Sequence, residues 1–264
     1  MGELTGRACL VTGGSRGIGR AIALELAAAG ASVVVHYGRS REAARRTADD
    51  IRALGRDGVA LSADLTEPDD IEALFDAVED RFGRLDVLVN SAASFERKPI
   101  DEITAADWDA VQAVNVRAPF LCTPRAARLM RATNRAGLPG AERVPGSVIN
   151  LADMAGVTTW KEFAHHGVSK AALLHLTMVS ARELGPEVRV NAIIPGPVLP
   201  APGEDATSES WIAKGARVPL GRPGDVREVA TAAVFLTRND YVTGTTLFVD
   251  GGEHLLAGGG LLAR

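Results

Sequence analysis

Short apolar runs alternate with longer amphipathic segments along the whole chain. The runs are apolar at nearly every position, which is typical of strands buried on both faces of a parallel sheet, and they occupy residues 8–11, 32–36, 58–61, 87–90, 147–151, 188–194 and 246–249. Apolar residues recur at helical spacing over residues 18–26, 41–54, 68–82, 106–131, 163–184 and 225–237. The alternation predicts an α/β fold, a doubly wound, seven-stranded parallel sheet with helices on both faces.

The pattern indicates a single domain over residues 1–264. A chain of 264 residues with 46% hydrophobic residues can bury one large core, and neither an internal repeat nor a shift in composition marks a second unit. Residues 132–146 are rich in Gly and Pro and predict a surface connection. The polar segment 199–217, which contains Trp211, follows the sixth run and is interpreted as a substrate lid.

Composition and charge narrow the function classes. The net charge is -4 without a basic cluster, so nucleic acid is not an expected partner. Two cysteines form neither a disulfide framework nor a metal set, which fits a reducing cytoplasm, and five scattered histidines lack the spacing of a zinc site. No apolar run is long enough to span a membrane, and no leader is recognised. The sequence predicts a cytoplasmic protein without metal that acts on a small molecule.

A glycine-rich turn follows the first apolar run and opens a helical segment. Gly13, Gly17 and Gly19 allow the backbone to turn sharply and approach an anion, which the N-terminus of the following helix attracts. Any tight turn between a strand and a helix tolerates these glycines. However, the strand at 32–36 completes a strand-helix-strand unit of the length expected for dinucleotide binding, and the turn is therefore interpreted as a pyrophosphate site.

The residues after the second run favour NADPH over NADH. A site for NADH usually places a carboxylate there, whereas a 2'-phosphate is bound by arginine and hydroxyl groups. The segment His36-Tyr37-Gly38-Arg39-Ser40 has no carboxylate, and Arg16, Arg39 and Ser40 are the candidate phosphate ligands. The alternative is that Arg39 merely solvates the start of a helix.

The glycine spacing resembles that of the short-chain dehydrogenase/reductase family, and the resemblance covers essentially the whole chain. It implies a Rossmann fold, a homotetramer and a helical asparagine, Asn115, in the active site. The cofactor contacts that it implies are Gly13, Ser15, Arg16, Gly17, Ile18, Gly19, His36, Tyr37, Arg39, Ser40, Asp64, Leu65, Asn90, Ser91, Ala92, Lys170, Pro195, Gly196 and Val198. Asp64 and Asn115 could each serve the fold instead, because Asp64 suits a helix cap and Asn115 could accommodate a kink before Pro119.

The chain departs from the family at its proton donor. The family has tyrosine four residues before the lysine and serine thirteen residues before the tyrosine; here His166 and Asp153 occupy these positions, and Lys170 is retained. His166 and Lys170 lie on one face of a helix. In the family the phenol donates a proton as hydride arrives, and the lysine lowers the pKa of the phenol and holds the nicotinamide ribose.

Aspartate at the serine position resembles one subgroup, the pteridine reductases. The same subgroup is resembled by His36-Tyr37-x-Arg39-Ser40, Asn90-x-Ala92-x-Ser94-Phe95 and Val249-Asp250-Gly251-Gly252. The resemblance implies that arginine and serine bind the 2'-phosphate and that Phe95 stacks on a flat ring. Trp160 and Trp211 are further candidate substrate contacts, although Trp160 could instead anchor a turn.

These observations lead to a hypothesis with two rivals. The hypothesis is an NADPH-dependent reductase of a C=N or C=O bond in a flat cyclic substrate, in which Asp153 and His166 form a coupled proton source and Lys170 holds the ribose. The first rival is a ketone reductase for a polyketide or acyl-carrier substrate. The second is a cofactor-binding protein without reductase chemistry, in which His166 is a packing residue and the site serves regulation or non-redox ring chemistry.

Overall fold

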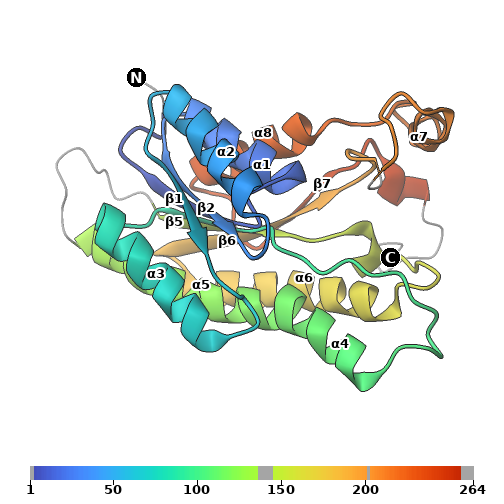
Figure 1. Ribbon diagram of the computed structural model, residues 1–264, viewed down its shortest axis with the longest axis horizontal. Helices are drawn as coiled ribbons and strands as arrows, with labels where there is room; N and C mark the ends of the chain where they lie inside the picture. Colours follow the sequence, from blue (N-terminus) through green and yellow to red (C-terminus); the bar gives the residue numbers. More distant parts are fainter. Residues whose placement is uncertain (1–2, 136–144, 201–202, 257–264) are drawn as a thin grey trace.

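Seven parallel strands form one sheet at the centre of the molecule (Figure 1). The computed structural model describes residues 3–135, 145–200 and 203–256. The strand order is β3-β2-β1-β4-β5-β6-β7, and the strands are β1 (Ala8–Thr12), β2 (Ser32–Tyr37), β3 (Gly58–Ser62), β4 (Val87–Asn90), β5 (Gly146–Leu151), β6 (Val188–Pro195) and β7 (Thr246–Val249). The order reverses between β1 and β4, and ligands of such sheets bind beyond the carboxyl ends of the strands at this point.

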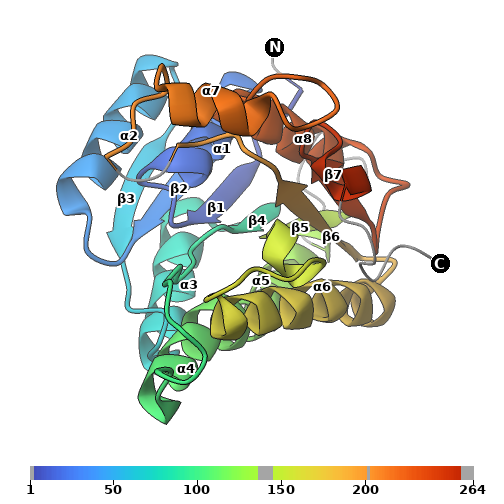
Figure 2. The same ribbon diagram turned by 90° about the vertical axis from the view of Figure 1, so that its right-hand side faces the viewer.

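Helices cover both faces of the sheet, as the strand pattern predicts (Figure 1). One face carries α1 (Gly17–Ala28), α2 (Arg41–Ala53) and α8 (Val226–Arg238); the other carries α3 (Pro68–Phe82), α5 (Ala118–Arg135) and α6 (Ala164–Leu184). In Figure 2, α7 (Glu209–Gly215) lies above the sheet, whereas α4 (Ala105–Gln112) extends from the lower layer.

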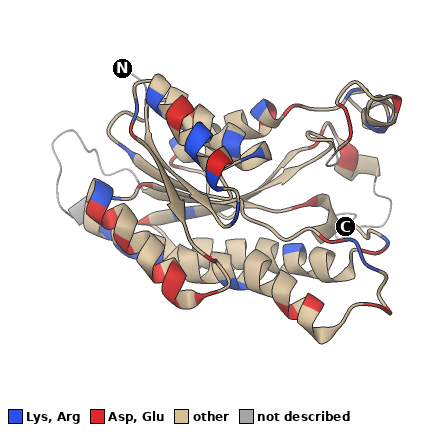
Figure 3. Cartoon of the chain, viewed as in Figure 1, with Lys and Arg blue, Asp and Glu red and all other residues tan. Residues whose placement is uncertain are grey.

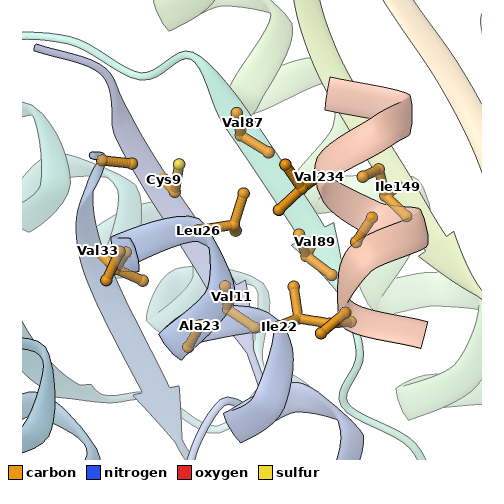
Figure 4. Close-up of a cluster of buried hydrophobic side chains, with 14 of the residues drawn as sticks. Cys9, Val11, Ile22, Ala23, Leu26, Val33, Val87, Val89, Ile149 and Val234 are labelled. Atoms are coloured by element: carbon orange, nitrogen blue, oxygen red, sulfur yellow. The ribbon is translucent and has the colours of Figure 1, made fainter. Parts of the chain in front are cut away.

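Alternating side chains of each strand fill two separate cores. Figure 4 shows one of them, in which Val11 and Val89 of the sheet pack with Ile22 and Leu26 of α1 and with Val234 of α8. Leu10, Leu88 and Val148 point to the opposite face and pack with Phe75 and Met130. Because both faces of the strands are covered, their near-continuous apolar runs correctly predicted a parallel sheet.

The helix predicted over residues 106–131 is divided in the structure. It consists of α4, a π-helical segment η1 (Ala113–Arg117) and α5, which continues to Arg135. The extra residue of a π-helical turn displaces the following helix, and such turns are frequent at functional sites. The rest of the connection predicted at 132–146 lies at 136–144, outside the described residues, and β5 begins at Gly146.

The segment predicted to be a lid contains a short helix. Within 199–217, Ser208 caps α7 by accepting a hydrogen bond from the backbone N–H of Trp211. Leu199 lies close to the start of α1, since a Cβ built on Gly17 would lie 3.3 Å from Leu199 Cδ2. No helix among the described residues is both long and apolar enough to cross a membrane.

Candidate active site

The glycine turn between β1 and α1 is closely packed against the end of β4. Gly13 has a φ of +64°, and a Cβ there would lie 2.9 Å from the Cα of Ala92; a Cβ on Gly19 would collide with the carbonyl oxygen of Gly13. The N-cap of α1, Arg16, makes no side-chain capping bond, and the first turn of α1 has no acidic residue. The turn therefore leaves the N–H groups of the first turn of α1 without a side-chain cap, as an anion site requires.

His36 supports this turn from behind. Its Nδ1 accepts a hydrogen bond from the Gly13 N–H at 3.2 Å, and its Nε2 lies 3.1 Å from the Ala63 carbonyl oxygen. The side chain is buried, and burial lowers the pKa of His36, so the neutral ring with its proton on Nε2 satisfies both contacts. The predicted contact of His36 with the cofactor stays a prediction, and the ring also links the glycine turn to the end of β3.

Two exposed guanidinium groups flank the turn. Arg16 and Arg39 have no ion-pair partner within 4.0 Å among the described residues, and Ser40 follows Arg39 at the start of α2. Asp64 lies close enough to Arg39 for the two charges to interact. Its carboxylate accepts hydrogen bonds from the N–H and the hydroxyl of Thr66, and these bonds lower its pKa. Asp64 thus closes a local turn, and the N-cap of α3 is Glu67, not Asp64.

A buried line of polar side chains fixes the strand ends beside the turn. The Thr12 hydroxyl accepts hydrogen bonds from the backbone N–H groups of Ser91 and Ala92. Asn90 donates to Asn150 Oδ1 at 2.8 Å, and Asn150 donates to the Thr177 hydroxyl of α6 at 2.9 Å. Asn90, a predicted cofactor contact, is therefore engaged with β5, while the backbone of Ser91 and Ala92 borders the turn.

Residues predicted to face the nicotinamide form a tight corner after β6. The Gly196 N–H donates to the Val249 carbonyl oxygen at 3.0 Å, and a Cβ on Gly196 would lie 2.5 Å from the Cα of Asp250. Only glycine fits this close approach. The corner directs the chain from Pro195 through the buried Val198 into the segment at 199–217.

The predicted proton-transfer residues lie together at the start of α6. Asp153 caps the short 3-10 helix η2 (Met154–Gly156) by accepting a hydrogen bond from Ala155 N–H through Oδ1. Its Oδ2 lies 3.5 Å from His166 Nε2. One turn further along α6, Lys170 Nζ donates to the Leu151 carbonyl oxygen at 2.8 Å. Burial lowers the pKa of Lys170 to about 8, and the nearby Asp153 opposes this effect.

The other side of the His166 ring is held by Asn115 through a backbone carbonyl. His166 Nδ1 lies 3.1 Å from the carbonyl oxygen of Ser94. Asn115, in the π-helical segment, accepts from Ser94 N–H at 2.8 Å and donates to the Ser94 carbonyl oxygen at 3.0 Å and to the Ser169 hydroxyl at 2.9 Å. His166 Nε2 is buried and has no hydrogen-bond partner in the described part of the chain. The ring therefore presents one unsatisfied nitrogen toward Asp153.

Aromatic side chains border the same ring. Phe95, which is 57% exposed, lies 4.9 Å from Phe163 and meets His166 edge-on at 4.8 Å between ring centroids. Trp160 packs edge-on against Phe163 at 5.8 Å. Phe95, Phe163 and Trp160 are called the aromatic wall below. Trp211, the third predicted substrate contact, is only 4% exposed on α7, where Lys214 lies over its ring.

Comparison with known proteins gives the family. The family model described as enoyl-(acyl carrier protein) reductase matches residues 13–254. A 3-oxoacyl-[acyl-carrier-protein] reductase of Synechocystis sp. is 35% identical over 96% of this chain and 98% of its own. A 3beta-hydroxysteroid dehydrogenase of Eggerthella lenta is 36% identical over 97% of each chain. A crystal structure of a short chain dehydrogenase from Burkholderia cenocepacia in complex with NADP has a TM-score of 0.84 at 35% identity, covering 95% of this chain and 99% of the other.

The chain belongs to the short-chain dehydrogenase/reductase family. It is therefore an oxidoreductase by family, with the family's seven-stranded sheet. Within this short-chain dehydrogenase/reductase, sequence reasoning missed the residues that hold the site from behind. Ser94 acts through its carbonyl oxygen, which no side-chain pattern reveals. Thr12 and Asn150 stand at the carboxyl ends of strands, where a polar residue was a usable signal.

A cavity of about 980 Å³ in this short-chain dehydrogenase/reductase lies beside η2 and the start of α6. Its lining includes Met154 and Val157 from the segment after Asp153, Trp160 and Phe163 from the aromatic wall, and Lys214 from α7. Glu253 borders it as well; burial raises the pKa of this carboxyl, and Lys214 opposes the effect. Within the described part of the chain, no three histidines, cysteines or acidic residues form a group that could hold a metal ion.

Proposed function

We propose that the protein is an NADPH-dependent oxidoreductase that transfers hydride between the nicotinamide and a C=O or C=N carbon of a flat cyclic substrate. The observation that supports this most is the pairing of His166 and Asp153 beside the aromatic wall. His166 Nε2, which has no hydrogen-bond partner among the described residues, is a buried polar atom that a substrate oxygen or nitrogen would satisfy. A carbonyl placed there would also contact Phe95.

The residues of the glycine turn fit a bound dinucleotide. Gly13 and Gly19 let the turn fold tightly against the end of β4, and the N-terminus of α1 has no side-chain cap, so its N–H groups could bind a pyrophosphate. Arg16 and Arg39 lack carboxylate partners within ion-pair distance among the residues described, which suits a 2'-phosphate. The relative solved with NADP supports the same choice of cofactor. When bound, NADPH would supply the hydride.

The chain's own residues would orient the substrate and move the proton. Phe95 and Phe163 would stack on the ring of the substrate, and the neighbouring cavity would accept its remainder. Asp153 and His166 would hold the transferred proton between them. Lys170, whose ammonium group already points at the strand end, would hold the ribose.

Two substrate classes remain as candidates within this proposal. A carbonyl or hydroxyl compound is supported by relatives whose names specify a 3-oxoacyl and a 3beta-hydroxysteroid group. A pteridine is supported by Asp153 in place of serine and by the exposed face of Phe95. The volume of the cavity favours a substrate larger than a simple alcohol or ketone.

The deciding experiment is NADPH oxidation by the purified protein with cyclic ketones, acyl thioesters with a 3-oxo group, quinones and oxidised pterins. We expect turnover with at least one class, and a loss of about a hundredfold or more in kcat for His166→Ala with NADPH affinity retained. His175→Ala, an exposed histidine on the same helix, is the matched control. Tight NADPH binding without turnover of any class would instead favour the non-reductase alternative.

A further inference from the structure

The protonation pattern of His166 differs from that of the tyrosine it replaces. A neutral phenol carries a proton on its single oxygen and donates it directly. A neutral imidazole has two nitrogens and one proton, and the hydrogen bond made by one nitrogen decides the state of the other. His166 Nδ1 lies 3.1 Å from the Ser94 carbonyl oxygen, which can only accept. The proton of the neutral ring therefore resides on Nδ1, and Nε2 carries a lone pair.

The Ser94 carbonyl is held in this position by Asn115. The Asn115 side chain bonds both the N–H and the carbonyl oxygen of Ser94, and it donates to Ser169 Oγ. Ser169 in turn donates to the His166 carbonyl oxygen at 2.6 Å. These hydrogen bonds fix the Ser94 carbonyl oxygen relative to the His166 ring. The backbone therefore favours the tautomer of His166 with its proton on Nδ1.

Few charged groups surround the ring. Asp153, the N-cap of η2, lies 3.5 Å from the ring, and Lys170 of α6 lies one helical turn away. Asp153 also interacts with Lys170 and with Glu253, which in turn interacts with Lys214. In the loop after β4, Arg97 is paired with Glu162 and Lys98 with Asp107. The π-helical segment contributes the neutral Asn115. Asp153 is thus the group that would stabilise a second proton on Nε2.

We infer that this site is built as a base for alcohol oxidation, an inference that rests on the proposed function. With neutral His166, Nε2 takes the proton of a substrate hydroxyl while the hydride of the same carbon passes to NADP+. The products are the ketone, NADPH and an imidazolium paired with Asp153. The imidazolium then releases its proton to water. In the reverse direction, the carbonyl can be protonated only when His166 already carries both protons.

Alcohol oxidation and ketone reduction need different protonation forms of His166, so their rates depend on pH in opposite ways. Ketone reduction needs a proton on both ring nitrogens, so its rate falls as the pH rises, whereas alcohol oxidation needs a bare Nε2, so its rate rises to a plateau. Lys170 acts on the ribose in both directions, so its titration changes both rates in the same sense. His36 supports the glycine turn that is proposed to bind the cofactor. Rates measured at saturating cofactor therefore do not include an effect of His36 on cofactor binding.

The test measures kcat in both directions from about pH 5.5 to about pH 9.5 with one alcohol and ketone pair that the protein turns over. We expect kcat for reduction to fall and kcat for oxidation to rise with increasing pH below about pH 8, where Lys170 keeps its charge. His166→Phe removes the base and the donor together, and the opposite pH dependences should vanish with most of the rate; His175→Ala should keep the wild-type profiles. Unchanged profiles in His166→Phe would overturn the inference.

A second measurement decides the position of the proton without turnover. Nitrogen-15 NMR of histidine-labelled protein, with His166→Gln used for assignment, distinguishes a protonated from an unprotonated ring nitrogen. We expect Nδ1 protonated and Nε2 bare in the neutral ring, and a proton on Nε2 would overturn the inference. If the NMR pattern is the expected one but no substrate turns over in either direction, the proposed function fails while the assignment of the proton stands.

Discussion

His36 shows how a single buried side chain can support the glycine turn from inside the fold. Its two ring nitrogens join the glycine turn to the end of β3. The sequence placed His36 at the correct strand end but could not show which way the ring points. The side chains of Tyr37 and Arg39, two neighbours in the same motif, are partly or fully exposed, whereas that of His36 is buried.

Replacement of His36 by Phe should weaken both the fold and NADPH binding. The Gly13 N–H and the Ala63 carbonyl oxygen would lose their partners, which costs about 1–3 kcal/mol for each group that stays buried. Because burial lowers the pKa of His36, the wild type should lose stability as pH falls below about 6.5, where the unfolded histidine binds a proton first. Urea unfolding at several pH values measures this slope, which His36→Phe should lack and His175→Phe should keep.

Lys170 should be a functional residue that destabilises the fold. A pKa lowered from 10.5 to about 8 corresponds to a penalty on the order of 3 kcal/mol for the charged form. Lys170→Met should therefore match or exceed the wild type in stability at pH 7, since the lost bond to Leu151 offsets part of the gain. The advantage should shrink between about pH 8 and about pH 10.5, where the folded lysine is already neutral. Lower stability of Lys170→Met throughout this range would contradict this prediction.

Arg39 should select NADPH over NADH. If Arg39 binds the 2'-phosphate, its loss removes a charge-assisted contact worth about 1.5–3 kcal/mol. Arg39→Ala should raise the Kd for NADPH roughly ten- to hundredfold and leave the Kd for NADH nearly unchanged. Fluorescence titration with both cofactors measures this, with Arg46→Ala on the exposed side of α2 as control. An equal effect on both cofactors would assign Arg39 to helix solvation instead.

Among the helices and strands, the sequence predicted those that have a regular apolar period. It did not predict the π-helical segment, where the helical pitch changes locally. Seven strands and the long helices followed from apolar spacing. The segment 106–131 was predicted as one helix. Apolar residues continue through the π-helical turn, so the spacing of apolar residues does not reveal the extra residue of that turn. Asn115 lies in the π-helical segment, where its side chain bonds to the backbone of Ser94; its role in the active site stays a prediction.

Thr12 should be as important to the alignment of β1 and β4 as the glycines are. Thr12→Val keeps the shape but removes the acceptor for the Ser91 and Ala92 N–H groups. We expect a loss of about 1–3 kcal/mol in the free energy of unfolding and weaker NADPH binding, because Ala92 lies against Gly13. Thr231→Val on the exposed face of α8 should change stability little. Equal losses in both variants would contradict a special role for Thr12.

At the scale of the whole molecule, charge is unevenly distributed over the helices. Figure 3 shows acidic and basic residues along α3, whereas most of α6 is uncharged. Large apolar side chains are exposed on the lower helical layer, among them Phe120 (56%), Val168 (51%) and Met178 (50%). Exposed apolar residues gathered on neighbouring helices are typical of subunit interfaces. This supports the homotetramer that the family resemblance implies.

A charge on this layer should therefore disrupt assembly. Met178→Glu should shift the protein to smaller species in sedimentation velocity, because the carboxylate would lose its hydration in the interface. The secondary structure should be retained, since Met178 is already half-exposed. Arg46→Glu, a charge change on the opposite layer, is the control and should leave the assembly intact. A tetramer that persists in Met178→Glu would place the interface elsewhere.

The proximity of Leu199 to Gly17 has a consequence for the order of events in turnover. Leu199 opens the segment that was predicted to be the lid, while Gly17 belongs to the turn proposed for the pyrophosphate. The same segment borders the cavity through Lys214 at its other end. A dinucleotide bound in the turn would lie beneath the segment 199–217. We therefore expect the dinucleotide to bind before the substrate and to dissociate after the product. The enzyme would then wait, between reactions, for its spent cofactor to exchange.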